Sequence, residues 1–284
     1  FEARVTSFSS RISILPDPII VREAFGQVTF GAQGLRVTEL ALRLPGTLLR
    51  GNLTVGPRSP GDAWTFWTVL EADGWGDLSD LAWIDARIPL GRFRGEASIS
   101  VDQGVLVDLD RLEVDMEASN FVANGHVGFG DVMSFRALEV GANPLTLARL
   151  EPWLEVEFPL AGWLSGQATF NGTIEDLTAT GRVTLVPTGY GGTPTTADFS
   201  GTVHRGANPG ATGFEARLDA INYTVLEAIW PGLPWAGTGS GQLELGGRID
   251  DGLQIVADFT HDAVSGPISR ATWSGVVRRG QQEG

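Results

Sequence analysis

The sequence predicts a mainly β protein built from short strands joined by tight turns. The 38 glycines and 15 prolines are scattered between short apolar runs and are not massed in tracts. Hydrophobic residues make up 42% of the chain and charged residues 19%, a balance that lets the chain bury apolar surface and fold. Apolar and polar residues alternate within the runs, which is the pattern of an antiparallel sheet with one wet face.

One unit of sequence recurs along the chain. Residues 159–174 and 234–249 are identical at half of their aligned positions. A glycine that opens this strand recurs every 69 to 75 residues, at Gly26, Gly95, Gly166 and Gly241. A second glycine, in the pattern apolar-x-Gly-x-apolar, recurs every 74 to 76 residues, at Gly51, Gly125, Gly201 and Gly275. This period predicts an elongated repeat array whose units stack into a curved sheet.

A strand of the form Phe-x-Ala-x-Leu closes each predicted unit. Residues 214–218 match residues 1–5 in their first four letters, and looser copies begin at Phe66 and Phe135. The expected division is residues 1–8 as the closing strand of a missing earlier repeat, followed by repeats 9–73, 74–141, 142–221 and 222–284, the last truncated. We therefore expect the chain to be an internal fragment of a longer array.

A short helix is expected in each repeat, before the first glycine. Asn143 is predicted to cap this helix, Pro144 to occupy its first position and Pro152 to stop it. Residues 222–231 repeat the arrangement, Asp77 begins a similar stretch, and residues 9–16 form a weaker copy.

The alternation assigns a set of apolar residues to one face of the predicted strands. Two interpretations stay open for them: an open apolar groove, or an ordinary sandwich core in which they pack on each other. The groove or core candidates are Val28, Phe30, Leu49, Leu53, Ala97, Ile99, Ala123, Val127, Ala168, Phe170, Phe199, Val203, Leu243, Leu245, Trp273 and Val277.

Charge and composition exclude several kinds of partner. Twenty basic residues against 34 acidic ones give a net charge of −14, which repels phosphate backbones, so we expect no nucleic-acid partner. The chain has no cysteine, hence no disulfide and no thiolate metal site. It contains no apolar run of about 18 residues or more, so no transmembrane helix is expected within it.

No catalytic or metal-binding motif stands out. His126, His204 and His261 are far apart in sequence and share no pattern. A nucleophile elbow, a phosphate loop and a dinucleotide fingerprint are all missing from the sequence. We therefore expect a protein that is not an enzyme and that has no catalytic residue, metal or cofactor.

One acidic stretch suggests calcium but is better explained as the solvated face of a strand, because its carboxylates alternate with valine and leucine. Its members are Asp102, Asp108, Asp110, Glu113, Asp115 and Glu117.

Tryptophan is abundant, with nine copies. Trp64 and Trp67 lie three apart in one strand region and should point to opposite faces. Trp230 and Trp235 flank prolines in a loop. Exposed tryptophan favours protein interfaces and the membrane interfacial zone, so these four residues are interface candidates.

Three elements of the sequence resemble the AsmA/TamB family of Gram-negative cell envelopes. They are a repeated Leu-x-x-Leu helix, the strand Pro-Leu-Ala-Gly-Trp-Leu-Ser-Gly-Gln at residues 159–167, and the hairpin at residues 171–185. The resemblance covers nearly the whole chain. It implies a periplasmic, membrane-associated β groove that carries phospholipid between membranes or assists outer-membrane assembly. It also implies that the parent chain is anchored by a transmembrane helix outside this fragment.

The lipid hypothesis has a physical requirement of its own. Two acyl chains of about 15 methylenes each would cost roughly 25 kcal/mol to expose to water, so a carrier needs a continuous apolar trough. The resemblance therefore implies membrane lipid as partner and bound phospholipid as the one non-protein component. The rival hypothesis, favoured by the tryptophans, is a non-catalytic extrinsic scaffold subunit docked on an integral membrane protein complex.

Overall fold

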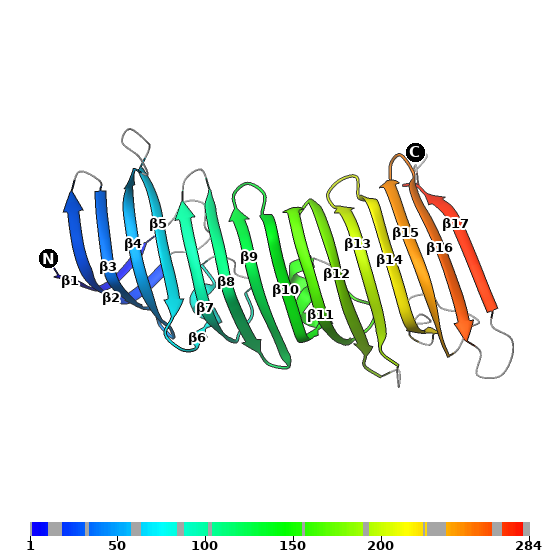
Figure 1. Cartoon of the computed structure of the whole chain (residues 1–284), viewed down its shortest axis with the longest axis horizontal. Helices are drawn as coiled ribbons and strands as arrows, with labels where there is room; N and C mark the ends of the chain where they lie inside the picture. The colour runs from blue at the N-terminus through cyan, green and yellow to red at the C-terminus, as the bar shows by residue number, and fades with distance from the viewer. Residues whose placement is uncertain are drawn as a thin grey trace. The chain divides into compact units, whose positions relative to one another are not determined.

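The computed structural model describes residues 2–10, 19–31, 34–57, 64–83, 88–101, 104–154, 157–189, 193–223, 225, 237–262 and 269–280. Strands contain 75% of these residues. The predicted mainly β class is confirmed: the strands are antiparallel and form curved sheet that is not closed (Figure 1). The chain divides into two compact units, Phe1–Leu138 and Glu139–Gly284.

Unit 1 is a run of antiparallel strands, each paired with its neighbour in sequence; β7 pairs with both β5 and β6. Its elements are β1 (Glu2–Ser10), β2 (Ile19–Gly31), β3 (Gly34–Arg43), β4 (Leu48–Pro57), β5 (Trp64–Ala72), β6 (Gly76–Asp77), the 3-10 helix η1 (Leu78–Leu81), β7 (Arg92–Val101), β8 (Val105–Met116) and β9 (Ser119–Phe129).

Unit 2 has the same plan and begins within β10 (Ser134–Thr146). From β11 to β17 every strand pairs antiparallel with the next. Its elements after β10 are α1 (Leu147–Leu154), β11 (Gly162–Thr173), β12 (Asp176–Pro187), β13 (Thr195–His204), β14 (Gly210–Asn222), β15 (Thr238–Arg248), β16 (Leu253–Asp262) and β17 (Ser269–Val277).

The two ends of the strands differ in each unit. We call the end that carries η1 in unit 1, or α1 in unit 2, the helix edge; the opposite end, where tight turns join the strands, is the hairpin edge (Figure 1). Deeply buried side chains gather at the helix edge, including Leu78, Met116, Ile221 and Tyr223. The core of each unit therefore lies along the helix edge.

The recurring glycines sit where the neighbouring strand leaves no room for a Cβ. Gly201 has a φ of 139°, and a Cβ there would lie 2.3 Å from the Cα of Phe214. The register of β13 against β14 shifts at this point, between Ser200 and Thr202. Such β-bulges bend a strand and increase its twist, which accounts for curvature at the glycine positions. That the predicted repeats superpose stays a prediction.

The helix predictions had mixed outcomes. Asp77 caps η1 as predicted, because its side chain accepts a hydrogen bond from the Ser79 N–H at 2.9 Å. The predicted cap at Asn143 is wrong: β10 continues to Thr146, and a residue before proline, here Pro144, favours extended backbone.

The predicted stop at Pro152 is also wrong. This proline lies inside α1, which continues for two residues to Leu154. Asn222 ends β14, and most of the predicted helix 222–231 lies outside the described residues, as does most of segment 9–16. A helix in every repeat stays a prediction. In the part of the chain that the structure describes, no helix has the length and hydropathy of a membrane span.

Candidate functional site

Strand register brings all the predicted groove residues of unit 2 onto one face, which we call the apolar face. Residues paired directly across antiparallel strands share a face. One row of such pairs crosses the whole unit: Ala168, Gly181, Phe199, Ala216, Leu243, Ala257 and Trp273. Neighbouring rows place Phe170, Val203, Leu245 and Val277 on the same side.

Unit 1 shows the same arrangement. Its central row on the apolar face is Val28, Val37, Leu53, Thr68, Ile99, Val107 and Val127. The remaining candidates, Phe30, Leu49, Ala97 and Ala123, occupy adjacent rows of this face. The polar member Thr68 is buried, and its hydroxyl donates to the Asn52 carbonyl at 2.7 Å.

Among the described residues, no second sheet covers the apolar face of either unit, because all of the described strands belong to one antiparallel sheet. Trp273 remains 47% exposed and Val203 37% exposed, while Phe199 and Leu243 are half-buried. The described strands thus offer no second sheet to these side chains, and the choice between a groove and a packed core stays a prediction.

Formal charge is excluded from this face in two runs of strands, β3–β9 and β11–β17. Between β11 and β17 the register assigns no arginine, aspartate or glutamate to it, and His261 is its one titratable residue in the described strands. The same holds from β3 to β9 in unit 1, where the described apolar-face positions carry no charged side chain. Such segregation gives each unit a continuous apolar surface.

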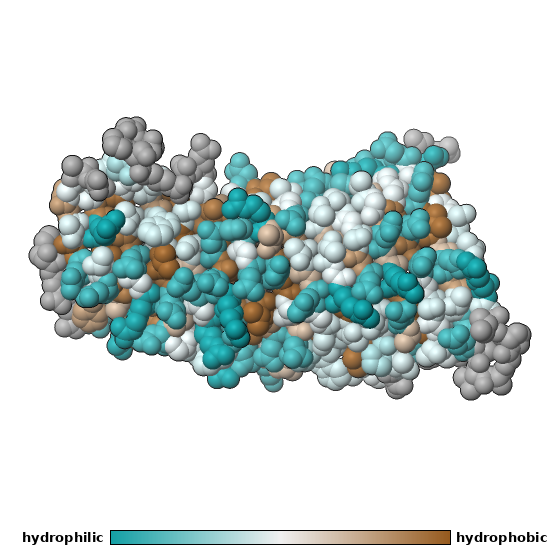
Figure 2. All heavy atoms as spheres, viewed as in Figure 1, coloured by the Kyte–Doolittle hydropathy of each residue, from teal (hydrophilic) through white to brown (hydrophobic). Residues whose placement is uncertain are grey.

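On the opposite face of unit 2, which we call the polar face, polar side chains of neighbouring strands pair with one another. Opposite charges alternate across three strands, from Arg182 to Asp198 to Arg217. Hydroxyls pair across strands as well, with Thr178 and Thr202 joined at 2.8 Å. Figure 2 shows hydrophilic side chains running in bands over this face.

Arginines hold the carboxylates of the polar face in their charged form. Hydrogen bonds from Arg94 and Arg111 lower the pKa of Glu113. In unit 2 the hydrogen bond from Arg270 lowers the pKa of Asp258 in the same way. The acidic stretch of unit 1 thus forms a solvated strand face with ion pairs, as predicted for its described residues; Asp102 lies outside them.

Two of the three histidines have carboxylate partners that sequence spacing did not reveal. His126 contacts Asp108 across β8 and β9. His204 contacts Asp176 through Nδ1 and Thr212 through Nε2, the latter at 2.7 Å. His204 also lowers the pKa of Asp176.

A hydroxyl, an imidazole and a carboxylate in series resemble the order of a nucleophilic triad. On this sheet, however, these three residues lie on neighbouring strands of the polar face and pair across them, as Thr178 and Thr202 do. We therefore assign Thr212, His204 and Asp176 to the polar ladder of the sheet.

Tyr223 closes the apolar face at the helix edge of unit 2. It is 1% exposed, and its hydroxyl donates to the Thr260 carbonyl at 2.7 Å. Its ring lies over Gly239 and meets His261 edge-on, with ring centroids 5.5 Å apart. Burial raises the pKa of Tyr223. Sequence reasoning missed this residue, since it falls in the predicted helix 222–231 and nothing local marks its ring as the cover of a strand.

The predicted interface tryptophans are only partly described. Trp64 and Trp67 point to opposite faces as predicted, Trp64 to the apolar face and Trp67 to the polar face. They are 61% and 44% exposed. Trp230 and Trp235 lie outside the described residues.

Comparison of this chain with protein-family models, with curated proteins and with solved structures finds no match.

Proposed function

We propose that this chain is part of a lipid-binding groove protein of the cell envelope, of the AsmA/TamB kind that its sequence resembles. The apolar face binds the acyl chains of phospholipid, and the polar face is in water. In this proposal the chain has no catalytic role, and its surroundings are the periplasm and the adjoining membranes.

The observation that carries the proposal is a continuous apolar face that, in the described parts of β3–β9 and β11–β17, carries no formal charge and faces no second sheet. A globular protein would cover such a face with a second layer, because each square ångström of apolar surface left in water costs about 25 cal/mol. Exposed apolar surfaces of this kind mark binding sites for apolar partners. Acyl chains suit it because they need contact along their length and no hydrogen bonds.

A matched pair of variants in β11 tests the proposal. Phe170→Asp places a charge on the apolar face, whereas Thr169→Asp places the same charge one residue away on the polar face. Burying an unpaired charge against acyl chains is unfavourable. Phospholipid extracted from the purified chain and quantified by mass spectrometry should fall strongly for Phe170→Asp and stay unchanged for Thr169→Asp.

Folding is checked first, by circular dichroism of both variants. Equal lipid content in two folded variants, or a wild-type chain with no phospholipid, would rule out the lipid-binding groove.

The scaffold hypothesis is the second candidate, and exposed tryptophans on the polar face favour it. Trp67 is 44% exposed and Trp163 is 40% exposed, both on the side away from the apolar face. A docked subunit would copurify in fixed ratio with an integral membrane complex and be released by Trp67→Ala. Copurification of that kind without bound phospholipid would favour the scaffold over the groove.

A further inference from the structure

The hairpin edge of unit 1 carries a row of apolar residues that includes three phenylalanines. Pairs across β2 to β5 and β7 to β9 place this row on the apolar face, beside the turns. Its members are Phe30, Leu35, Val55, Phe66, Val101, Val105 and Phe129. Trp64 is the next residue of this face on β5, opposite Pro57. We call the row and Trp64 together the rim.

Two aromatic side chains of the rim are open to solvent. Phe30 is 71% exposed and Trp64 is 61% exposed, whereas Val105 of the same row is buried. Each square ångström of apolar surface left in water costs about 25 cal/mol, so an exposed aromatic rim favours an apolar partner. Tryptophan suits a partner with a wet boundary, because its ring is apolar while its indole N–H needs a hydrogen-bond acceptor.

The polar face of unit 1 carries little formal charge behind the rim. The row there is Thr29, Arg36, Thr54, Trp67, Ser100, Leu106 and Gly128. Arg36 is its one charged residue, and the described turn after β9 adds Asp131. These two charges cancel, in a chain whose net charge is −14. In its described residues from β2 to the turn after β9, the hairpin edge is therefore aromatic and close to neutral.

The hairpin edge of unit 2 has a different character. Its matching row consists of small or aliphatic residues: Gly172, Leu177, Val203, Ala211 and Gly247. Charged side chains accompany this row. Asp176 contacts His204 and Arg248, and Asp250 lies 3.4 Å from Arg279.

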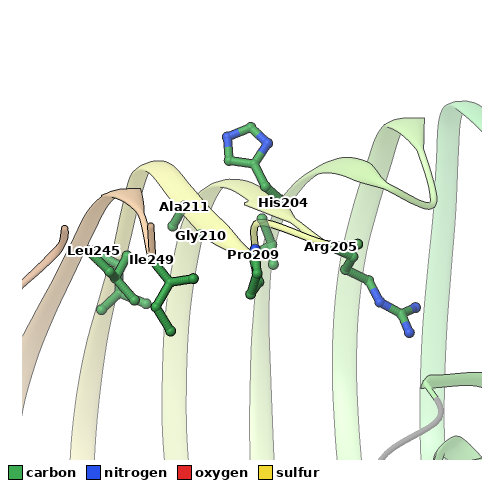
Figure 3. A pocket seen from close by; sticks show the side chains of 10 residues that line it. His204, Arg205, Pro209, Gly210, Ala211, Leu245 and Ile249 are labelled. Atoms are coloured by element: carbon green, nitrogen blue, oxygen red, sulfur yellow. The ribbon is translucent and has the colours of Figure 1, made fainter. Parts of the chain in front are cut away.

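Apolar groups at that edge of unit 2 lie behind the turns. An open cavity of about 380 Å³ is lined there by residues that include Leu245, Ile249 and Arg205. Figure 3 shows His204 projecting above the turn, while Leu245 and Ile249 lie below it. The rim of unit 1 thus offers exposed rings to a flat partner, and the edge of unit 2 offers polar groups.

The chemistry of the rim fits a lipid bilayer better than a protein surface. Protein interfaces carry about one hydrogen bond per 100–200 Å². The side chains of the phenylalanine-containing row have no donor or acceptor for such bonds. A bilayer requires none in its hydrocarbon, and its interfacial zone is where tryptophan rings are enriched in membrane proteins. The negative net charge opposes anionic lipid, so a zwitterionic surface is the better match.

We propose that the rim docks on the surface of a zwitterionic lipid bilayer, with the rings of Phe30 and Trp64 in the interfacial zone. The inference rests on the proposed function for the presence of a membrane, and it is measured separately. Binding to such an interface strengthens with the apolar area that is buried, so these two exposed rings should contribute most. Because the rim belongs to the apolar face, bilayer lipid would meet that face at unit 1.

A single fluorescent label tests whether the rim enters the bilayer. The chain has no cysteine, so one cysteine can be introduced and labelled with nitrobenzoxadiazole, whose emission rises in apolar surroundings. Gly31→Cys places the label beside Phe30, where a Cβ meets nothing within 4 Å. Ala207→Cys is the matched control, since Ala207 is exposed in the turn between β13 and β14. With phosphatidylcholine vesicles, emission should rise at position 31 and stay unchanged at position 207.

Variants without label test which side chains hold the rim on the bilayer. Phe30→Ala combined with Trp64→Ala should lower the vesicle partition coefficient at least about tenfold, because both rings are lost from the interface. Trp163→Ala removes a ring that is 40% exposed at the start of β11, and should leave the coefficient within about twofold. Vesicle flotation measures both, and added salt should leave wild-type binding unchanged because the rim is close to neutral.

Three results would overturn the membrane contact: no binding to phosphatidylcholine vesicles, equal partition of the double variant and the wild-type chain, or a rise in emission at position 207 without one at position 31. Binding only to vesicles that contain an integral membrane protein would also overturn it and favour the scaffold hypothesis. If circular dichroism shows that the double variant does not fold, the two labelled chains decide alone. Absence of phospholipid from the purified chain would defeat the groove and leave the rim standing.

Discussion

The two faces of the sheet differ in what their side chains contact. On the polar face, side chains pair with one another: Arg270 donates to Asp258 at 2.8 Å, and Ser240 meets Thr260 at 2.7 Å. On the apolar face, side chains such as Phe199 are half-buried and have no opposing layer. The difference teaches that strand pairing and the polar ladders hold the sheet together without help from the apolar face, the face to which we assign lipid binding in our proposal.

The apolar face itself differs between its two edges. At the helix edge of unit 2, Tyr223 is 1% exposed and Ile221 is 3% exposed. Towards the hairpin edge, Val203 and Val277 are 37% and 38% exposed. The large aromatic and aliphatic side chains buried most deeply in unit 2 are therefore at the helix edge, while Val203 and Val277 near the hairpin edge stay partly exposed.

The largest expected loss of stability comes from removing the buried ring of Tyr223 at the helix edge. Tyr223→Ala should lower the free energy of unfolding by about 3–5 kcal/mol, because a buried aromatic ring is lost and the Thr260 carbonyl loses its donor. Urea unfolding followed by circular dichroism measures the loss.

Tyr223→Phe is the control for that variant, since it keeps the ring and removes one hydrogen bond. Its cost should be about 0.5–1.5 kcal/mol. A loss below about 1 kcal/mol for Tyr223→Ala would mean that the helix edge is not where unit 2 is stabilised.

A smaller effect is expected at Gly201 of β13, which lies opposite the bulge in β14. Gly201→Ala should cost about 1–3 kcal/mol, because φ is 139° and the new Cβ would lie 2.3 Å from the Phe214 Cα. Gly246→Ala is the control, since a Cβ there meets nothing within 4 Å, and it should stay within about 0.5 kcal/mol of wild type. Equal urea midpoints for the two variants would contradict the role assigned to the bulge.

The smallest expected effect is on how stability depends on pH, through the pair of Arg270 and Asp258 on the polar face. The hydrogen bond from Arg270 puts the folded pKa of Asp258 below its ordinary value of 3.8, which applies in the unfolded chain. The contribution of this pair is thus present above pH 3.8 and is lost as the pH falls through the folded pKa.

Arg270→Gln should therefore be less stable than wild type near neutral pH, and the gap should narrow as the pH drops below 3.8. Thermal unfolding midpoints across this range measure the gap. A gap that widens in acid would show that the pair does not act in this way.

Much of the fold could be predicted from sequence because strand side chains alternate with period two. A bulge changes that phase only in the strand that holds the extra residue. Opposite Gly201 this strand is β14, so Phe199 and Val203 of β13 remain on one face. The faces of the candidates were predictable for this reason. The start of α1 was not, because continued extension of β10 through Asn143 prevailed over its capping preference.

Contacts between distant segments were also beyond sequence reasoning. The pairing of His204 with Asp176, the ring of Tyr223 over Gly239 and the cavity beside Arg205 all depend on which turns and strands lie next to each other. That adjacency is set by register, which composition and spacing do not specify.

The most direct test of the central claim is photo-crosslinking in cells that produce the protein, from two adjacent positions of β13. A benzophenone side chain replaces Phe199 on the apolar face or Ser200 on the polar face, and mass spectrometry identifies what each captures. The account predicts phospholipid adducts at position 199 and none at position 200. Equal lipid capture at both positions, or capture of protein alone at position 199, would contradict it.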